Sequence, residues 1–149
     1  MGKLILILAF VFIHAETNNK AEGALRSVFE LEEVQSYFNR SPRFTTSHSY
    51  SVILLKDKKL ELYGAPNINS IPVKVVNITD SIDMSKVYAY IQLNEFQIKN
   101  NKAKVNLELQ NAKLLLEDQK KVKLMASLKR VDDVWQVEKY DLEEINIFE

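Results

Sequence analysis

The chain has 149 residues, of which 46% are hydrophobic and 27% are charged, with 20 basic and 20 acidic side chains. This length fits one domain with a single core, and the composition excludes a disordered or repeat protein. A balanced charge disfavours nucleic-acid binding. The chain has no cysteine, which excludes disulfides, thiolate metal sites and cysteine nucleophiles.

Residues 1–15 have the pattern of a secretory signal peptide. Lys3 gives a charged start, residues 4–13 are apolar, and Ala15 is a small residue that suits signal peptidase. The apolar run is shorter than the roughly 20 residues that span a bilayer. We therefore predict cleavage after Ala15 and export to the periplasm or the medium. The mature domain, residues 16–149, would have no integral membrane segment and a net charge of −1, because Lys3 is lost. An uncleaved anchor or a buried N-terminal helix is the alternative.

An amphipathic helix is predicted from Asn19 to Asn39. Asn19 and Glu22 have capping-box spacing, and Pro42 prevents the helix from continuing. The acidic residues between them are interpreted as a solvent-exposed face. Apolar residues recur at helical spacing and form the expected buried stripe: Leu25, Val28, Leu31, Val34 and Phe38.

Three short strands are predicted next, over residues 50–55, 59–63 and 73–78. Their apolar residues alternate or run continuously, and turn residues separate them. Pro72 fits an entry or edge position of the third strand. Residues 79–85 form a polar loop.

A long hairpin over residues 87–110 is the predicted centre of the sheet. The polar turn from Lys99 to Asn101 joins two alternating runs. Ala89, Ile91 and Leu93 lie at odd positions, whereas Phe96 and Ile98 lie at even ones, so we predict a β-bulge near residues 94–95. Tyr88 and Tyr90 project opposite to Ala89 and Ile91. We expect them to lie against a second layer or to line a concave surface.

A second hairpin is predicted from residues 122–129 and a strand that begins at Trp135, with a turn over residues 131–133. Residues 111–121 are interpreted mostly as a loop. The tail from Glu138 to Glu149 contains five acidic residues and one lysine. It either adds an edge strand or docks loosely, and the order of the chain after Tyr140 stays open.

These elements predict the α+β class. The expected fold is one N-terminal amphipathic helix packed on a curved antiparallel sheet of about five to seven strands.

No catalytic, metal or cofactor site is predicted. His48 is the one histidine left after signal cleavage, and it is interpreted as a loop residue although Ser47 and Ser49 flank it. Asp132 and Asp133 are read as turn residues rather than metal ligands. The three glycines are too far apart for a phosphate-binding loop. The chemistry therefore leans against an enzyme.

Three aromatic residues are the candidate ligand- or partner-binding residues: Tyr88, Tyr90 and Trp135. Lysines within residues 99–104 and 120–130 could form a basic patch across the sheet. Because the acidic tail would cancel its field, a solvated face is the preferred interpretation. Asn39 and Asn77 begin formal glycosylation sequons, which matter only in a eukaryotic secretory pathway.

Residues 90–109 read YIQLNEFQIKNNKAKVNLEL, Tyr37-Phe38 ends the helix, and residues 128–137 read LKRVDDVWQV. Over residues 25–140 the chain resembles small exported bacterial proteins of unassigned function. Its order of elements is similar to the cystatin/NTF2-like class of helix-on-sheet folds. The resemblance implies a fold and assigns no functional residue.

The leading hypothesis is an exported, non-catalytic binding or accessory module. It would hold a protein segment or a small apolar ligand on the concave sheet face, as a monomer or homodimer. One alternative is an NTF2-like enzyme or cavity carrier in which His48, Tyr50 and Asp83 converge. The other is a cystatin-like inhibitory interaction protein.

Overall fold

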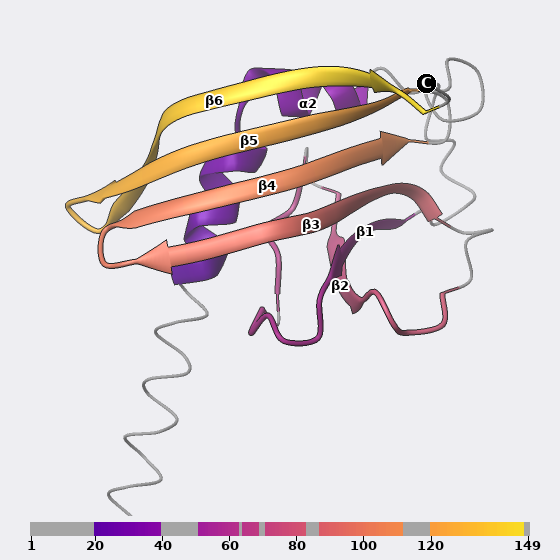
Figure 1. Cartoon of the computed structure of the whole chain (residues 1–149), viewed down its shortest axis with the longest axis horizontal. Helices are drawn as coiled ribbons and strands as arrows, with labels where there is room; N and C mark the ends of the chain where they lie inside the picture. Colours follow the sequence, from indigo (N-terminus) through magenta and orange to yellow (C-terminus); the bar gives the residue numbers. More distant parts are fainter. Residues whose placement is uncertain are drawn as a thin grey trace, which may run out of the picture.

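The computed structural model describes residues 20–39, 51–62, 64–68, 71–82, 87–111 and 120–147. Two helical segments pack on one face of a six-stranded sheet (Figure 1). Residues 1–19, which include the predicted signal peptide, lie outside the described residues. The elements are a helix over residues 20–29, α2 (Glu32–Asn39), β1 (Ser51–Lys56), β2 (Val73–Asn77), β3 (Val87–Lys99), β4 (Lys102–Asn111), β5 (Lys120–Val131) and β6 (Val134–Asn146).

The predicted single helix is two helical segments with a break at Glu30 and Leu31. The Leu31 N–H donates to the Val28 carbonyl at 3.2 Å, which is the tighter bonding of a 3₁₀ turn. The apolar stripe nevertheless continues across the break, because Phe29 on one side and Val34 on the other are buried. The amphipathic pattern was thus predicted correctly and the continuity was not.

The sheet has the strand order β2-β1-β3-β4-β5-β6 and is mixed, which corrects the predicted antiparallel sheet. β1 pairs in parallel with both β2 and β3, while β3 to β6 are antiparallel. Parallel pairing of β1 and β2 requires the chain to return to the starting end of β1 before β2 begins. Residues 57–72 make this return.

The strand predicted over residues 59–63 is also wrong for residues 59–62, and Tyr63 lies outside the described residues. Asp57 turns the chain instead, since its carboxylate accepts the Lys59 N–H at 2.7 Å. Lys56 is 8% exposed, and its ammonium donates to the Leu60 carbonyl at 2.7 Å and to Asn77 Oδ1 at 3.0 Å. These bonds hold the turn against the ends of β1 and β2.

The two predicted hairpins are confirmed. The register between β3 and β4 shifts between Leu93 and Glu95, which is the predicted bulge. Asn100 has a φ of 57°, and Asp132 and Asp133 have φ values of 48° and 64°. These left-handed conformations suit tight hairpin turns and are tolerated by Asn and Asp. The acidic tail forms an edge strand, because β6 extends to Asn146 and pairs with β5 along its length.

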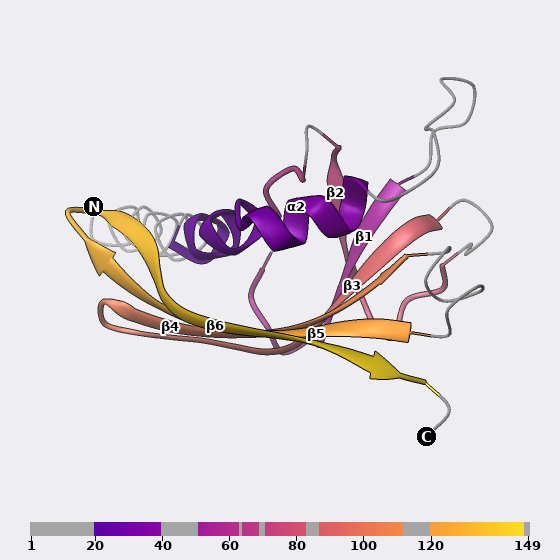
Figure 2. The same cartoon turned by 90° about the horizontal axis from the view of Figure 1, so that it is seen from above.

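The sheet bends around the helices, so that the helices lie on its concave face (Figure 2). Hydrogen bonds between described residues join the two layers. Ser27 Oγ donates to the Trp135 carbonyl at 2.8 Å, the Tyr37 hydroxyl donates to the Leu109 carbonyl at 3.0 Å, and the Tyr140 hydroxyl donates to Glu33 Oε1 at 2.5 Å. The helix position along the sheet is therefore fixed by polar contacts as well as by the core.

Candidate functional site

The side chains on the concave face of the sheet form the hydrophobic core together with those of the helices. Its side chains on β3, β4 and β5 alternate with exposed ones and are buried beneath the helices. The concave face is therefore inaccessible. The prediction that a ligand or partner binds on this face is corrected accordingly. The buried sheet residues are Ala89, Ile91, Leu93, Ala103, Val105, Leu107, Leu109, Val122, Leu124, Ala126 and Leu128.

We call the opposite side of β3 to β6 the outer face, and it faces the viewer in Figure 1. Because the strands are in register, its side chains form rows that cross the strands. One row contains Lys99, Lys102 and Lys129, one residue from each of β3, β4 and β5. The next contains Lys104 and Lys139, with Ser127 between them. We call these five lysines the lysine rows; all five are exposed.

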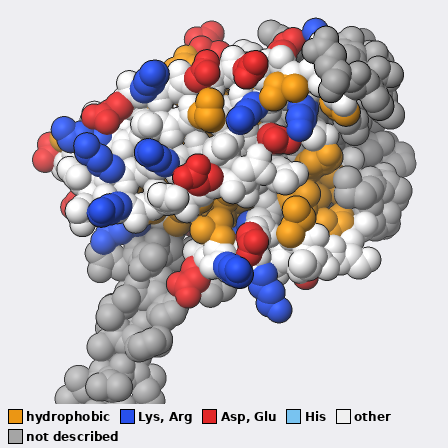
Figure 3. All heavy atoms as spheres, in the orientation of Figure 1, with side chains coloured by type: hydrophobic (Ala, Val, Ile, Leu, Met, Phe, Trp, Pro, Cys, Tyr) orange, Lys and Arg blue, Asp and Glu red, His pale blue; other side chains and the backbone are white. Residues whose placement is uncertain are grey.

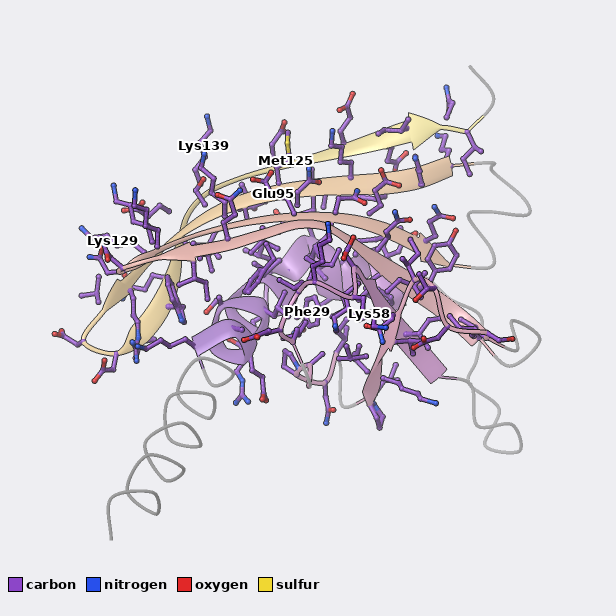
Figure 4. The ribbon with its side chains drawn as sticks, turned by 60° about the horizontal axis from the view of Figure 1, so that its bottom comes forward. Phe29, Lys58, Glu95, Met125, Lys129 and Lys139 are labelled. Carbon is purple, nitrogen blue, oxygen red and sulfur yellow. The ribbon has the colours of Figure 1, made fainter. Side chains whose placement is uncertain are left out.

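The lysine rows lie at the end of the sheet where the β3-β4 and β5-β6 hairpins turn. Figure 3 shows Lys and Arg side chains gathered over that half of the outer face. Lys129 lies near the turns, whereas Lys139 and Met125 project from the side of the sheet away from Phe29 (Figure 4). A chain of zero net charge therefore carries a locally basic surface.

A groove of about 610 Å³ crosses the outer face beside the lysine rows. Four residues in one row line it: Glu95 on β3, Asn106 on β4, Met125 on β5 and Asp141 on β6. Met125 is 43% exposed. Asn106 Oδ1 is buried and accepts no hydrogen bond from any described residue. The groove is also lined by Lys104 and Lys139, so it offers an apolar contact, an acceptor, two carboxylates and two ammonium groups.

Beyond the groove the outer face has charges of both signs on neighbouring strands. Lys121 Nζ lies 2.9 Å from Glu108 Oε2, and Lys123 pairs in register with Glu143. Such alternation is the usual arrangement of an exposed sheet face, since opposite charges on neighbouring strands attract. The lysine rows differ from it in having one sign of charge.

Tyr90 and Trp135 were predicted to share a binding surface, but the structure places them on opposite faces of the sheet. Tyr90 is half-buried on the outer face, where its hydroxyl donates to Gln110 Oε1. Burial raises the pKa of Tyr90, the nearby Glu108 charge raises it further, and Lys121 opposes the rise. Tyr88 lies on β3, and its side chain is outside the described residues.

Trp135 is 6% exposed and belongs to the core. Its ring packs so closely on the helix that a Cβ added at Gly23 would lie 3.2 Å from Trp135 Cδ1. The indole Nε1 has no hydrogen-bond partner among the described residues. Trp135 is one of the residues that line a cleft of about 580 Å³ between the helix over residues 20–29 and the β5-β6 hairpin. Trp135 is therefore a core residue that also borders a cleft.

Other candidate residues were placed differently or fall outside the described residues. His48, Tyr50 and Asp83 lie outside them, so the NTF2-like catalytic set stays a hypothesis. Asp132 and Asp133 form the predicted turn. Within the described ranges, no cluster of three or more His, Asp or Glu side chains could hold a metal ion. The same ranges contain no helix long and apolar enough to cross a membrane.

The two sequon asparagines end regular elements. Asn39 is the last residue of α2, and its side chain is outside the described residues. Asn77 ends β2, and its amide Nδ2 donates to Asp80 Oδ2 at 3.1 Å. Since Asn77 Oδ1 also accepts from Lys56, both ends of this side chain are engaged in the fold.

The groove residues Glu95, Asn106, Met125 and Asp141 were missed by sequence reasoning. Each has the polarity or position of an ordinary solvent-facing residue. Their alignment depends on the β3-β4 bulge and on the β5-β6 register, which cannot be counted from the sequence alone. The exposed Met125 within an otherwise polar set of outward positions was the available signal.

Comparisons with known proteins identify no relative by sequence: no family model and no curated protein matches the chain. Among solved structures it is similar in part to a de novo designed β-sheet protein with a cystatin fold (17% identity, 39% of this chain and 68% of that chain, TM-score 0.31). It is similar in part to an NTF2-like protein of unknown function from Shewanella baltica OS155 (12% identity, 38% and 42%, TM-score 0.32). A second de novo β-sheet design matches with 21% identity over 38% of this chain and 59% of the design, with a TM-score of 0.29.

Proposed function

We propose that this protein is a non-catalytic binding module that holds a segment of another protein on the outer face of β3 to β6. The groove that is lined in part by the exposed side chain of Met125 carries this proposal. Met125 gives an apolar anchor at the centre of a polar surface, which is the arrangement found in protein-binding patches. As a predicted exported chain, the protein would act in the periplasm or the medium.

The lining of the groove favours a polypeptide over a small apolar ligand. Sites for apolar small molecules have mainly apolar walls. Here Met125 lies among Glu95, Lys104, Lys139 and Asp141. A polypeptide can satisfy these charged groups with its own side chains and backbone amides, whereas an apolar molecule would bury them without partners.

Among the described residues, the titratable groups with shifted pKa values are divided between the two faces of the sheet. Tyr90 lies on the outer face, whereas Glu33 and Tyr140 bond to each other at the edge of the helix layer. Catalytic acids and bases act within hydrogen-bond reach of one reacting centre. Tyr90 therefore cannot act at one centre with Glu33 and Tyr140, which lie within hydrogen-bond reach of each other.

A random peptide library displayed on phage tests the proposal, with peptide affinity measured on purified protein. We expect selected peptides to lose binding when Met125 is changed to Glu, because a charge replaces the apolar anchor. Ile78→Glu is the matched control, since Ile78 is also exposed (52%) and lies beyond the end of β2. A library that yields no binder, or binders that tolerate Met125→Glu, would overturn the proposal.

A further inference from the structure

We propose that the lysine rows select an acidic polypeptide segment, whose carboxylates lie over Lys99, Lys102, Lys104, Lys129 and Lys139. This inference rests on the proposed function and names the chemistry of its partner.

Three of the lysines face one another directly across the strands. Lys102 is the register partner of Lys99 on one side and of Lys129 on the other. Like charges directly opposite each other destabilise a sheet. The chain has 20 acidic residues, but none of those that the structure describes lies between these lysines. Farther along the same face, by contrast, Glu108 pairs with Lys121. The fold therefore tolerates a repulsion that an anionic partner would relieve.

The lysine rows also have no internal counter-charge. Within the described residues, none of the five ammonium groups makes an ion pair or a hydrogen bond, whereas those of Lys120 and Lys121 both pair with glutamates. All five residues are exposed, so a ligand can reach them without any change in the fold. The strands fix the positions of the five positive charges relative to one another, although each long lysine side chain can still change its rotamer.

The spacing of the lysines fits an extended polypeptide. Side chains on one side of an extended chain repeat about every 7 Å, and neighbouring strands lie about 4.8 Å apart. Lys102 and Lys104 share the outer side of β4 at the first of these repeats. Lys99 and Lys129 flank Lys102 on the two neighbouring strands. A segment lying above β4 would thus meet lysines below it and on both sides.

The groove row limits how far the acidic part of the segment can extend. Glu95 and Asp141 lie in the row next to Lys104 and Lys139. Their carboxylates would repel further acidic residues, so the segment must become neutral or basic there. Asn106 Oδ1 lies in the same row without a partner among the described residues. A small rotation of this amide would let it accept a backbone N–H from the segment.

Other anionic partners fit less well. Single-stranded nucleic acid is held by aromatic side chains on which bases stack, and the lysine rows contain none. An anionic membrane would also approach the adjoining β5-β6 turn, where the exposed residues Asp132 and Asp133 would be repelled. A polypeptide has the carboxylates, the backbone donors and the width that the face requires.

The test is fluorescence anisotropy with a labelled glutamate-rich peptide and a glutamine-rich peptide of the same length. We expect the acidic peptide alone to bind, with affinity that falls as salt is raised. The double variant Lys102→Glu, Lys129→Glu should weaken binding of the acidic peptide about tenfold or more, because two lysines that attract its carboxylates become glutamates that repel them. Lys58→Glu combined with Lys59→Glu is the matched control, since both side chains are exposed and lie in the turn after β1. This control should leave the affinity within about twofold.

Three outcomes would overturn the inference: equal binding of the two peptides, equal losses in the two double variants, or tighter binding of an equally charged nucleic acid or sulfated polysaccharide. Failure here is distinguishable from failure of the proposed function. If library peptides depend on Met125 but the acidic peptide does not bind, the outer face binds peptides of other chemistry. If no library peptide binds, the proposed function itself fails.

Discussion

Lys102 on β4 lies directly opposite Lys129 on β5, in the same cross-strand row as Lys99 on β3. Three positive charges therefore meet on adjacent strands, although a well-paired set of opposite charges lies farther along the same face. The outer face is consequently divided into a basic end and a mixed end. This division, together with the groove between the two, is the basis of the proposed binding role.

Reversing the central charge of this row should stabilise the fold. In Lys102→Glu the row becomes positive, negative, positive, and both neighbouring contacts become attractive. We expect the free energy of unfolding to rise by about 0.5–1 kcal/mol at low salt. Denaturant unfolding at low and high salt measures this change, which should shrink as salt screens the charges.

Lys58→Glu is the control for this variant, because Lys58 is exposed in a turn outside the lysine rows. It should change stability by less than about 0.5 kcal/mol. Should Lys102→Glu prove neutral or destabilising at low salt, the lysines do not repel one another in the folded protein.

Trp135 should behave as a core residue in stability measurements. Replacing it with Ala removes a buried indole and leaves a cavity against Gly23, so we expect a loss of about 3 kcal/mol or more. Val134→Ala, at a neighbour that is 60% exposed, should change stability by less than about 0.5 kcal/mol. Trp135→Phe should keep the affinity for outer-face peptides, because the indole lies on the other side of the sheet. Loss of peptide affinity in a folded Trp135→Phe variant would instead support the cleft as the binding site.

The hydrogen bond between Glu33 and Tyr140 should make the stability of the fold depend on pH in the acid range. The Tyr140 hydroxyl donates to the Glu33 carboxylate at 2.5 Å and lowers the pKa of Glu33 below its ordinary value of 4.5. A carboxyl with a lowered folded pKa stabilises the protein above its unfolded pKa, and this contribution is lost as pH falls through the folded pKa. The Tyr140→Phe variant should lack this contribution, so its stability should approach that of the wild type in acid.

Titration of the Glu33 carboxyl carbon by NMR provides the direct measurement. In Tyr140→Phe the pKa of Glu33 should return toward 4.5, because its largest cause of lowering is removed. An unchanged Glu33 pKa would show that the hydrogen bond across this exposed edge does not persist in solution.

The long hairpins could be predicted because their signals are local. Strict alternation from Ala103 to Leu109 fixes which side chains are buried, and the change of parity between Leu93 and Phe96 predicts the bulge. The direction of the short strands could not be predicted in this way. Whether β2 runs parallel to β1 depends on the turn that Asp57 and Lys56 make, through contacts with residues distant in the chain.

The candidate site was predictable only in part. The alternation places lysines on the solvent side of their strands, but their convergence depends on the register between β4 and β5. Acidic residues of the tail lie in other rows on β6: Asp141 is in the row next to Lys139, and Glu143 is one row farther along. Aromatic content pointed to Tyr90 and Trp135, yet alternation alone cannot say which face a helix will cover.

Amide chemical-shift mapping of the protein with a library-selected peptide locates the bound peptide on the fold. We expect the perturbed amides to lie on β3 to β6 around Lys102, Met125 and Asp141, while those of the helix over residues 20–29 and of β2 stay unchanged. Perturbations centred on the cleft beside Trp135, or on β1 and β2, would contradict binding on the outer face.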